Sequence, residues 1–295
     1  MSTVEQVTDP VAEHGEGPVW HPGWPGLRWV DMLAGDVLEL DPDTQAVTRH
    51  SVSRVVAALR PRADGGAVLA LERGFALAGA DLTGIRPLGE LWTDPGIRMN
   101  EGDCDPHGRF YCGTMAYAET PGAGTLYRLD PDGAVTTLLT GVTISNGLGW
   151  SPDGGTAYYV DTPTHRVDAF DYDHDGGLTA RRPLLRIPED AGAPDGLTVD
   201  ADGRLWVALW GGSAVRCYEP DGRLVEELAL PVTQVTACTF GGPGLDELYI
   251  TTSRQGTGPA AQPEAGALFR ARPGVRGRPA RTFGPNPVSK PIRPK

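Results

Sequence analysis

Hydrophobic and polar residues alternate in short stretches along almost the whole chain, and each stretch ends in a turn rich in Asp, Pro and Gly. Alternation with a period of two is typical of a β-strand that buries one face, and turns of this composition join antiparallel strands. Six segments share one plan, which is an apolar stretch, a turn and a second alternating strand. They read VWHPGWPGLRWVD, LRPRADGGAVLAL, DCDPHGRFYCGTM, GWSPDGGTAYYVD, TVDADGRLWVALW and TFGGPGLDELYIT. The chain is therefore predicted to contain six related β-hairpins.

The spacing of these hairpins matches that of propeller blades. The second residue of each turn recurs at intervals of 41, 43, 46, 49 and 42 residues, in the series Pro22, Ala63, Pro106, Pro152, Ala201 and Pro243. A second strand pair follows most of the hairpins, as in GDVLELDPDTQAV. Four short strands per unit, repeated six times, predict an all-β fold, a six-bladed β-propeller with four antiparallel strands per blade. The alternative is a pair of β-sandwiches joined near residue 140, which gives no reason for a sixfold repeat.

The repeats also predict the domain boundaries. Residues 1–285 are expected to form one propeller domain. Its first 15 residues should pair with the last blade, because an open ring would leave an exposed strand edge. Residues 286–295 are rich in Pro and basic residues and show no periodicity, so we expect a flexible tail there.

Composition and charge argue against a mainly helical fold and against several classes of partner. The 40 Gly and 27 Pro residues argue against a mainly helical fold. A formal net charge of −12 with scattered Lys and Arg argues against nucleic acid or an anionic membrane as the partner. The amino terminus lacks the basic and apolar regions of a secretory signal, and no run of about 18 apolar residues occurs. We therefore expect a cytoplasmic protein without a membrane-spanning helix.

Two sets of apolar residues are expected to serve packing. The widely spaced cysteines form no CxxC pair, so they are interpreted as small buried hydrophobes and not as metal ligands. Three tryptophans stand near matching strand positions and are interpreted as core residues. These residues are Cys104, Cys112, Cys217 and Cys238, and Trp20, Trp150 and Trp206.

Polar residues recur at one offset within the repeats. Residues at equal offsets should lie at equal height around the axis of a propeller, because the blades are related by pseudo-rotation. Six residues before the turn markers stand Glu16, Ala57, Asn100, Asn146, Asp195 and Ala237. Four of the six carry carboxylate or carboxamide groups, and bringing these together is costly unless a bound group compensates them. Such oxygen ligands suit Ca²⁺, Mg²⁺ or Mn²⁺, and Zn²⁺ or Fe²⁺ are further candidates. The alternative is hydrogen bonding of these groups to loop backbone and channel water.

A metal held by so few protein oxygens would keep open positions, which favours catalysis over structural support. It would polarise a carbonyl and acidify a bound water, and Asp195 could act as ligand and proton acceptor together, as in ester or lactone hydrolysis. Arg98 lies two residues before Asn100, so both side chains should face the same side of a strand. Glu119 lies in the stretch AYAETPGAG, a loop that could cover the channel mouth. A rim arginine in an ion pair and an ordinary loop glutamate are the alternatives for Arg98 and Glu119.

Several motifs together resemble one family. In order, EGPVW, RMNEGDCDPHGRFYCGTM, ISNGLGW, AFDYD, PDGLTVDADGRLWVA and the late FGG…LYITT are similar to those of the SMP-30/gluconolactonase/luciferin-regenerating-enzyme group, and closest to regucalcin-like sugar lactonases. The resemblance runs from about residue 11 to 285. It implies a six-bladed propeller with one catalytic divalent metal, Ca²⁺ first among the candidates. The implied metal ligands are Glu16, Asn146 and Asp195.

The resemblance also implies the substrate side of the site. The family's substrate-binding arginine and asparagine match Arg98 and Asn100, and its lid glutamate corresponds loosely to Glu119, where the loop register differs by about one residue. The implied substrates are lactones of aldonic acids such as gluconolactone, opened to the sugar acid. Alternatives are a metal-dependent hydrolase of another lactone, an aryl ester or an organophosphate, and a non-catalytic calcium-binding regulatory propeller.

Overall fold

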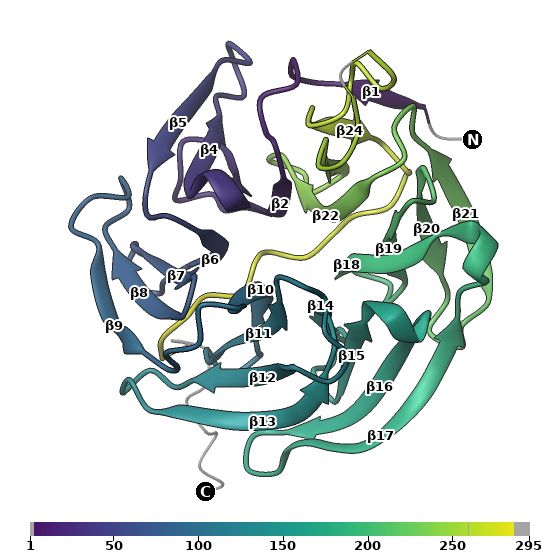
Figure 1. Ribbon diagram of the computed structural model, residues 1–295. Coiled ribbons are helices and arrows are strands. Elements are labelled where there is room, and N and C mark those ends of the chain that lie inside the picture. The colour runs from purple at the N-terminus through teal and green to yellow at the C-terminus, as the bar shows by residue number, and fades with distance from the viewer. Residues whose placement is uncertain (1–2, 259, 286–295) are drawn as a thin grey trace, which may run out of the picture.

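The computed structural model describes residues 3–258 and 260–285, and these form six four-stranded antiparallel sheets around a central axis (Figure 1). The predicted six-bladed propeller is confirmed. The three helices among the described residues are single 3₁₀ turns, η1 (Met32–Ala34), η2 (Thr162–Thr164) and η3 (Glu189–Ala191). None of them is long or apolar enough to cross a membrane. The predicted tail, residues 286–295, lies outside the described residues.

Blades 1 to 5 begin at the axis and run outward in chain order, and blade 6 does so except for its outermost strand. Blade 1 contains β2 (Gly15–Trp20), β3 (Leu27–Asp31), β4 (Asp36–Leu40) and β5 (Val47–Ser51). Blade 2 contains β6 (Val56–Pro61), β7 (Ala67–Leu71), β8 (Gly74–Ala78) and β9 (Arg86–Glu90). Blade 3 contains β10 (Ile97–Cys104), β11 (Phe110–Ala116), β12 (Gly124–Leu129) and β13 (Val135–Val142). Blade 4 contains β14 (Ser145–Trp150), β15 (Thr156–Asp161), β16 (Arg166–Asp173) and β17 (Gly177–Arg186). Blade 5 contains β18 (Ala193–Val199), β19 (Leu205–Trp210), β20 (Ala214–Tyr218) and β21 (Leu224–Ala229). Blade 6 contains β22 (Val235–Gly241), β23 (Glu247–Thr252), β24 (Phe269–Ala271) and the amino-terminal β1 (Val4–Gln6).

The amino terminus closes the ring, as predicted. Strand β1 pairs antiparallel with β24, so that Val4 lies opposite Ala271 and Gln6 opposite Phe269. The last blade is thus built from both ends of the chain, and its outer edge is paired by a segment that is remote in sequence.

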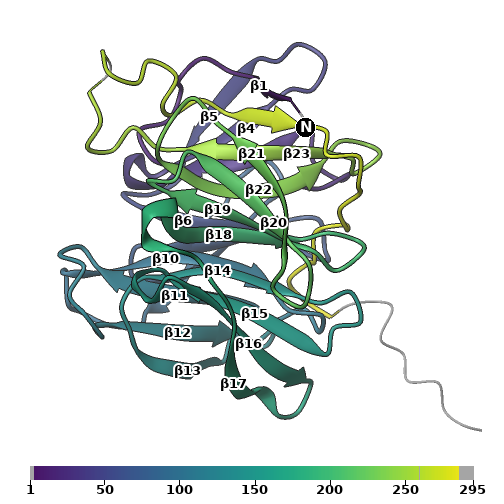
Figure 2. The ribbon, with the colours of Figure 1, turned by 90° about the vertical axis from the view of Figure 1, so that its right-hand side faces the viewer.

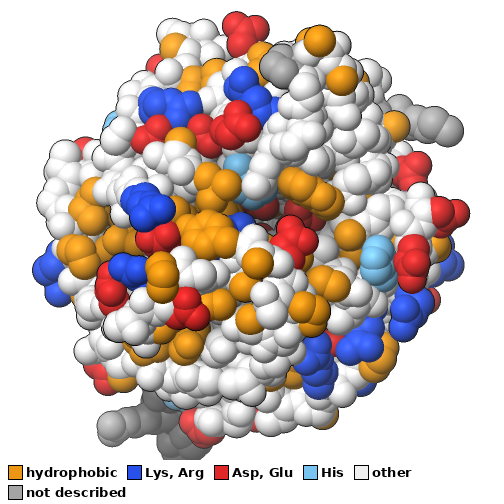
Figure 3. Space-filling view, viewed as in Figure 1, with side chains coloured by type: hydrophobic (Ala, Val, Ile, Leu, Met, Phe, Trp, Pro, Cys, Tyr) orange, Lys and Arg blue, Asp and Glu red, His pale blue; other side chains and the backbone are white. Residues whose placement is uncertain are grey.

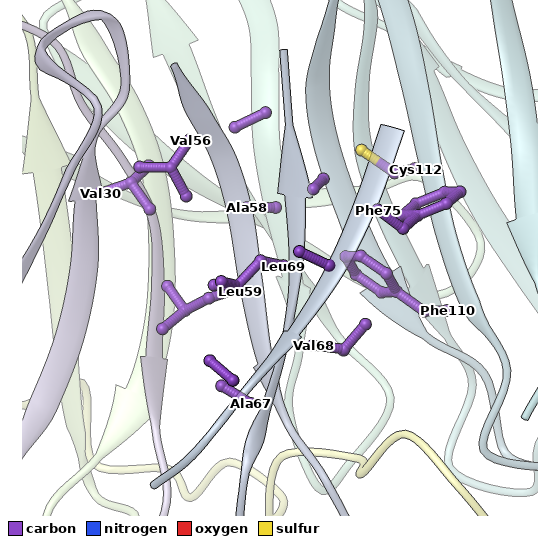
Figure 4. Close-up of a cluster of buried hydrophobic side chains, with 14 of the residues drawn as sticks. Val30, Val56, Ala58, Leu59, Ala67, Val68, Leu69, Phe75, Phe110 and Cys112 are labelled. Atoms are coloured by element: carbon purple, nitrogen blue, oxygen red, sulfur yellow. The ribbon is translucent and has the colours of Figure 1, made fainter. Parts of the chain in front are cut away.

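The hydrophobic core lies between neighbouring blades. Its largest cluster joins blades 1, 2 and 3, and Figure 4 shows part of it, in which Leu59 lies opposite Leu69 and the rings of Phe75 and Phe110 meet edge-on with 5.7 Å between their centroids. The four cysteines are buried and unpaired, as expected. Trp150 and Trp206 are fully buried, whereas Trp20 is only partly buried.

All six innermost strands carry a β-bulge at the same level. The register shifts lie after Glu16, between Val56 and Ala58, and at the corresponding places of β10, β14, β18 and β22. A bulge leaves residues unpaired and turns a side chain out of the alternating pattern. These bulges hold the polar ring of the sequence prediction, and in blade 6 the bulged residue is Thr236, not Ala237.

A carboxyl-terminal segment, residues 276–284, crosses the axis on one face of the ring; we call it the strap. Figure 1 shows it in yellow across the middle of the ring, and Figure 2 shows that it runs along one edge of the disc. Its hydrogen bonds reach five blades, through Leu245, Ala201, Ser151, Gly108, Pro61 and Ala63. Residue Gly277 packs so tightly that an added Cβ would lie 2.1 Å from the Cβ of Phe240.

Candidate functional site

A cavity of about 320 Å³ opens at the axis, on the face opposite the strap. It is lined by residues at the amino-terminal ends of the inner strands and by the loops that follow their neighbours. Figure 3 shows this face, with a central hollow bordered largely by apolar side chains and acidic side chains visible within it. All six residues predicted for the site line this one cavity, namely Glu16, Arg98, Asn100, Glu119, Asn146 and Asp195.

The bulges of the inner strands bring the candidate metal ligands together. Glu16, Asn146 and Asp195 come from three blades, and each is at most 5% exposed. A glycine follows each of these residues, and Gly147 and Gly196 lie in close approach to a neighbouring inner strand. A Cβ added to Gly147 would lie 2.6 Å from the backbone oxygen of Asp195, and Gly17 has a φ of +51°. These glycines therefore allow the ring to be narrow at this level.

The acidic residues at the axis are buried close to one another, which disfavours their charged forms. Burial raises the pKa of Glu16 to about 7, against the opposing effect of the Gly17 N–H, which donates to Glu16 Oε2 at 3.0 Å. Burial and the neighbouring charges of Glu16 and Glu101 raise the pKa of Asp195 well above its ordinary value. Burial and Glu16 likewise raise the pKa of Glu101. A cation between these carboxylates would relieve both the desolvation and the repulsion.

Two buried oxygen atoms without hydrogen-bond partners are available to such a cation. Among the residues that the structure describes, Asn146 Oδ1 and Asp195 Oδ1 are buried and accept no hydrogen bond, while Asn146 Nδ2 donates to Thr162 Oγ1 at 3.0 Å. The amide is thus turned with its oxygen free. Over the same residues, no cluster of three or more His, Cys, Asp and Glu has the geometry of a metal site. A metal at the axis would therefore need the Asn146 oxygen as its third protein ligand beside Glu16 and Asp195.

Arg98 and Asn100 form a unit beside these ligands. Arg98 Nη1 donates to Asn100 Oδ1 at 2.6 Å, and Asn100 Nδ2 donates to the backbone oxygen of Ser145 at 2.8 Å. Both ends of the amide are engaged, so these contacts give Asn100 a role in positioning Arg98. The Arg98 guanidinium also lies over the ring of Tyr117, 5.7 Å from its centroid. Burial lowers the pKa of Arg98.

His14 is a residue of the cavity lining that the sequence prediction missed. His14 lines the cavity with its Nδ1 2.8 Å from Ser253 Oγ and its ring edge-on to Trp210. Burial and the charge of Arg98 lower the pKa of His14 to about 3, so the imidazole is neutral. The position of His14 two residues before Glu16 was the available signal, since both side chains face the same side of a strand.

Apolar residues make up much of the cavity lining. Met115, Tyr117 and Trp210 line it together with the apolar residues Leu33, Ile144, Pro163 and Ala193. Tyr117 is held at the rim because its hydroxyl donates to Glu72 Oε1 at 2.7 Å. Glu119 also reaches the cavity lining, from a backbone with a φ of +52°. The structure thus places Glu119 at the cavity, in agreement with its predicted loop position. Its role stays a prediction.

Comparison with known proteins identifies relatives along nearly the whole chain. The chain is 39% identical over 285 residues to a pentonolactonase of Haloferax volcanii, with 94% of this chain and 97% of that protein covered. The solved luciferin-regenerating enzyme superposes with a TM-score of 0.88 at 31% identity, covering 96% of this chain and 99% of that one. A structure described as a calcium-binding protein, regucalcin, from Agrobacterium tumefaciens superposes with a TM-score of 0.88 at 29% identity, covering 96% and 97%.

The family model of the SMP-30/Gluconolactonase/LRE-like region matches residues 14–254. This range begins at His14 and contains every residue of the candidate site except Gln255. The match and the relatives together show that the chain belongs to the SMP-30/gluconolactonase/LRE-like family.

Proposed function

We propose that this protein hydrolyses a sugar lactone to the sugar acid with the help of one divalent metal ion, held by Glu16, Asn146 and Asp195. The observation that carries the proposal is the pair of buried, unpartnered oxygen atoms of Asn146 and Asp195 beside Glu16 at the floor of an open cavity. The relation to a named pentonolactonase supports lactones as the substrate class. Ca²⁺ is the first candidate because all three ligands are oxygens and a relative is described as calcium-binding.

The metal, when bound, would supply a Lewis acid that polarises the lactone carbonyl and lowers the pKa of water. Asp195 would accept the proton of the attacking water, since its carboxylate lines the cavity and has one buried oxygen that accepts no hydrogen bond. The Arg98 guanidinium, aligned by Asn100, would stabilise the negative charge that develops on the carbonyl oxygen. Glu119 at the mouth would bind sugar hydroxyls, while Tyr117 and Trp210 pack against carbon atoms of the ring.

Metal-restored lactone hydrolysis tests this proposal. After chelation we expect the enzymatic part of δ-gluconolactone and pentonolactone hydrolysis to disappear, and one of Ca²⁺, Mg²⁺, Mn²⁺, Zn²⁺ or Fe²⁺ to restore it. Rates are corrected for spontaneous opening. The same metals are tested with aryl esters and organophosphates, because the apolar cavity wall also fits less hydroxylated substrates. If no lactone is hydrolysed although one equivalent of metal is bound, the proposal is contradicted and a regulatory calcium-binding protein is favoured.

The raised pKa of Glu16 predicts how metal and pH act together on stability. The folded-state pKa of about 7 lies above the ordinary value of 4.5, so the metal-free protein loses stability as the pH rises from about 4.5 through 7. A bound cation compensates the carboxylate and removes this loss. We therefore expect the metal-induced rise in Tm to be larger at pH 8 than at pH 5.5, measured by thermal unfolding with and without chelator. Equal metal-induced shifts at both pH values would contradict Glu16 as a ligand.

A further inference from the structure

A second cavity, of about 70 Å³, lies at the other end of the axis, beneath the strap. Its walls are the carboxyl-terminal ends of the inner strands, including Asp103 and Trp150, and its cover is strap residues 278–281. The volume exceeds several-fold the minimum of about 10–15 Å³ that one water needs. It is therefore large enough for a small ion and too small for a sugar lactone. We call it the strap chamber.

Three guanidinium groups line the strap chamber, Arg60 from β6 and Arg278 and Arg281 from the strap. The two carboxyl groups in its lining are Glu101 and Asp103. Asp103 Oδ1 already accepts from Arg60 Nε at 2.6 Å and from the Cys104 N–H at 2.8 Å. Glu101 interacts electrostatically with Glu16, Arg60 and Asp103, and its Oε2 accepts no hydrogen bond from the described residues. The chamber thus holds three guanidinium groups and two carboxyl groups, of which Arg60 and Asp103 form an ion pair.

Neither Arg278 nor Arg281 forms an ion pair with a carboxylate among the described residues. Arg278 Nη1 donates only a long hydrogen bond of 3.3 Å to the Ser151 backbone oxygen. Arg281 lies over the ring of Trp150, 5.6 Å from its centroid, and makes no hydrogen bond or ion pair within the described chain. Burial lowers the pKa of Arg281, and this effect exceeds the opposing effect of the Asp103 charge. Its planar face is occupied by Trp150, so its N–H groups remain for a ligand.

We propose that the strap chamber binds a small oxyanion, held by Arg281 and Arg278 of the strap and by Arg60 of blade 2. A guanidinium presents parallel N–H donors that match the oxygens of phosphate, sulfate or a carboxylate. The anion would link the strap to the inner wall of the channel. It would add negative charge beside Arg281 and Arg278, which form no ion pair among the described residues, independently of the lactone cavity on the opposite face.

Phosphate binding to the full-length protein tests this site. Calorimetric titration with inorganic phosphate at constant ionic strength should show one saturable site, both as purified and after chelation, with sulfate competing. We expect Arg281→Gln to weaken phosphate binding by about tenfold or more, because hydrogen bonds to a charged group are lost. The exposed Arg182, which pairs with Asp171, provides the matched control, and Arg182→Gln should bind phosphate normally. Circular dichroism verifies that each variant is folded.

Arg278→Gln is the second variant, in case Arg281→Gln fails to fold, and should also weaken binding. Three results would overturn the proposal. These are absence of saturable phosphate and sulfate binding, binding that both strap variants leave unchanged, and binding that disappears on chelation, which would locate the phosphate at the metal. Acetate in place of phosphate distinguishes a carboxylate site from a site for tetrahedral oxyanions.

Discussion

Asp195→Asn should abolish lactone turnover and weaken metal binding while the propeller remains folded. The substitution keeps the size of the side chain but removes the charge of one ligand and the proposed proton acceptor. Loss of a general base alone costs about 10²–10⁴ in rate, and weaker metal binding adds to this. Because burial and Glu16 disfavour a charged Asp195, the metal-free variant should be at least as stable as the metal-free parent.

Three measurements separate these effects, namely the hydrolysis rate at saturating metal, the metal affinity by calorimetry and Tm after chelation. Asp202→Asn is the matched control in the same blade, because the Asp202 side chain is 64% exposed and lies in the turn that leads to β19. It should leave all three quantities unchanged. Normal turnover by Asp195→Asn would remove Asp195 from the mechanism.

Trp206→Ala should cost about 3–5 kcal/mol of unfolding free energy without affecting the site directly. Trp206 is 1% exposed and packs edge-on against Phe240 with 5.9 Å between ring centroids. Its Nε1 also donates to Asp200 Oδ2 at 3.1 Å, and truncation leaves that buried carboxylate without this donor. Both the cavity and the lost hydrogen bond therefore act in the same direction.

Denaturant titration followed by circular dichroism measures this loss. Trp206→Phe is the informative companion, since it retains a ring in the core and loses mainly the N–H donor and some volume. It should cost clearly less than Trp206→Ala. A loss below about 1 kcal/mol for Trp206→Ala would show that the space between blades 5 and 6 collapses around the truncated side chain.

The fold and much of the candidate site could be predicted because both follow the repeat. Turn residues at regular intervals mark the hairpins, and a common offset relates Glu16, Asn146 and Asp195. The structure brings these residues to one cavity, since equivalent strands surround a common axis. Residues at equal offsets in a repeat can therefore be predicted to lie close together even when no contact between them is known.

Features that break the repeat could not be predicted in this way. The bulge in β22 shifts the equivalent position from Ala237 to Thr236, whose hydroxyl donates to the Gly15 backbone oxygen at 2.6 Å. A count of residues back from the turn cannot detect such a shift, because the bulge and the turn vary in length independently. The contact of His14 with Ser253 joins residues 239 apart in sequence, and no local pattern encodes it.

The strap has a consequence for how the molecule opens. In arrays of repeats that contact only their neighbours, single units exchange their amide protons by separate local openings. Here one segment is hydrogen-bonded to five of the six blades, so a blade that opens beside the strap must break its bonds to a segment that the other four blades hold in place. Slow hydrogen exchange beside the strap is thus expected to be shared by the five blades that residues 276–284 join.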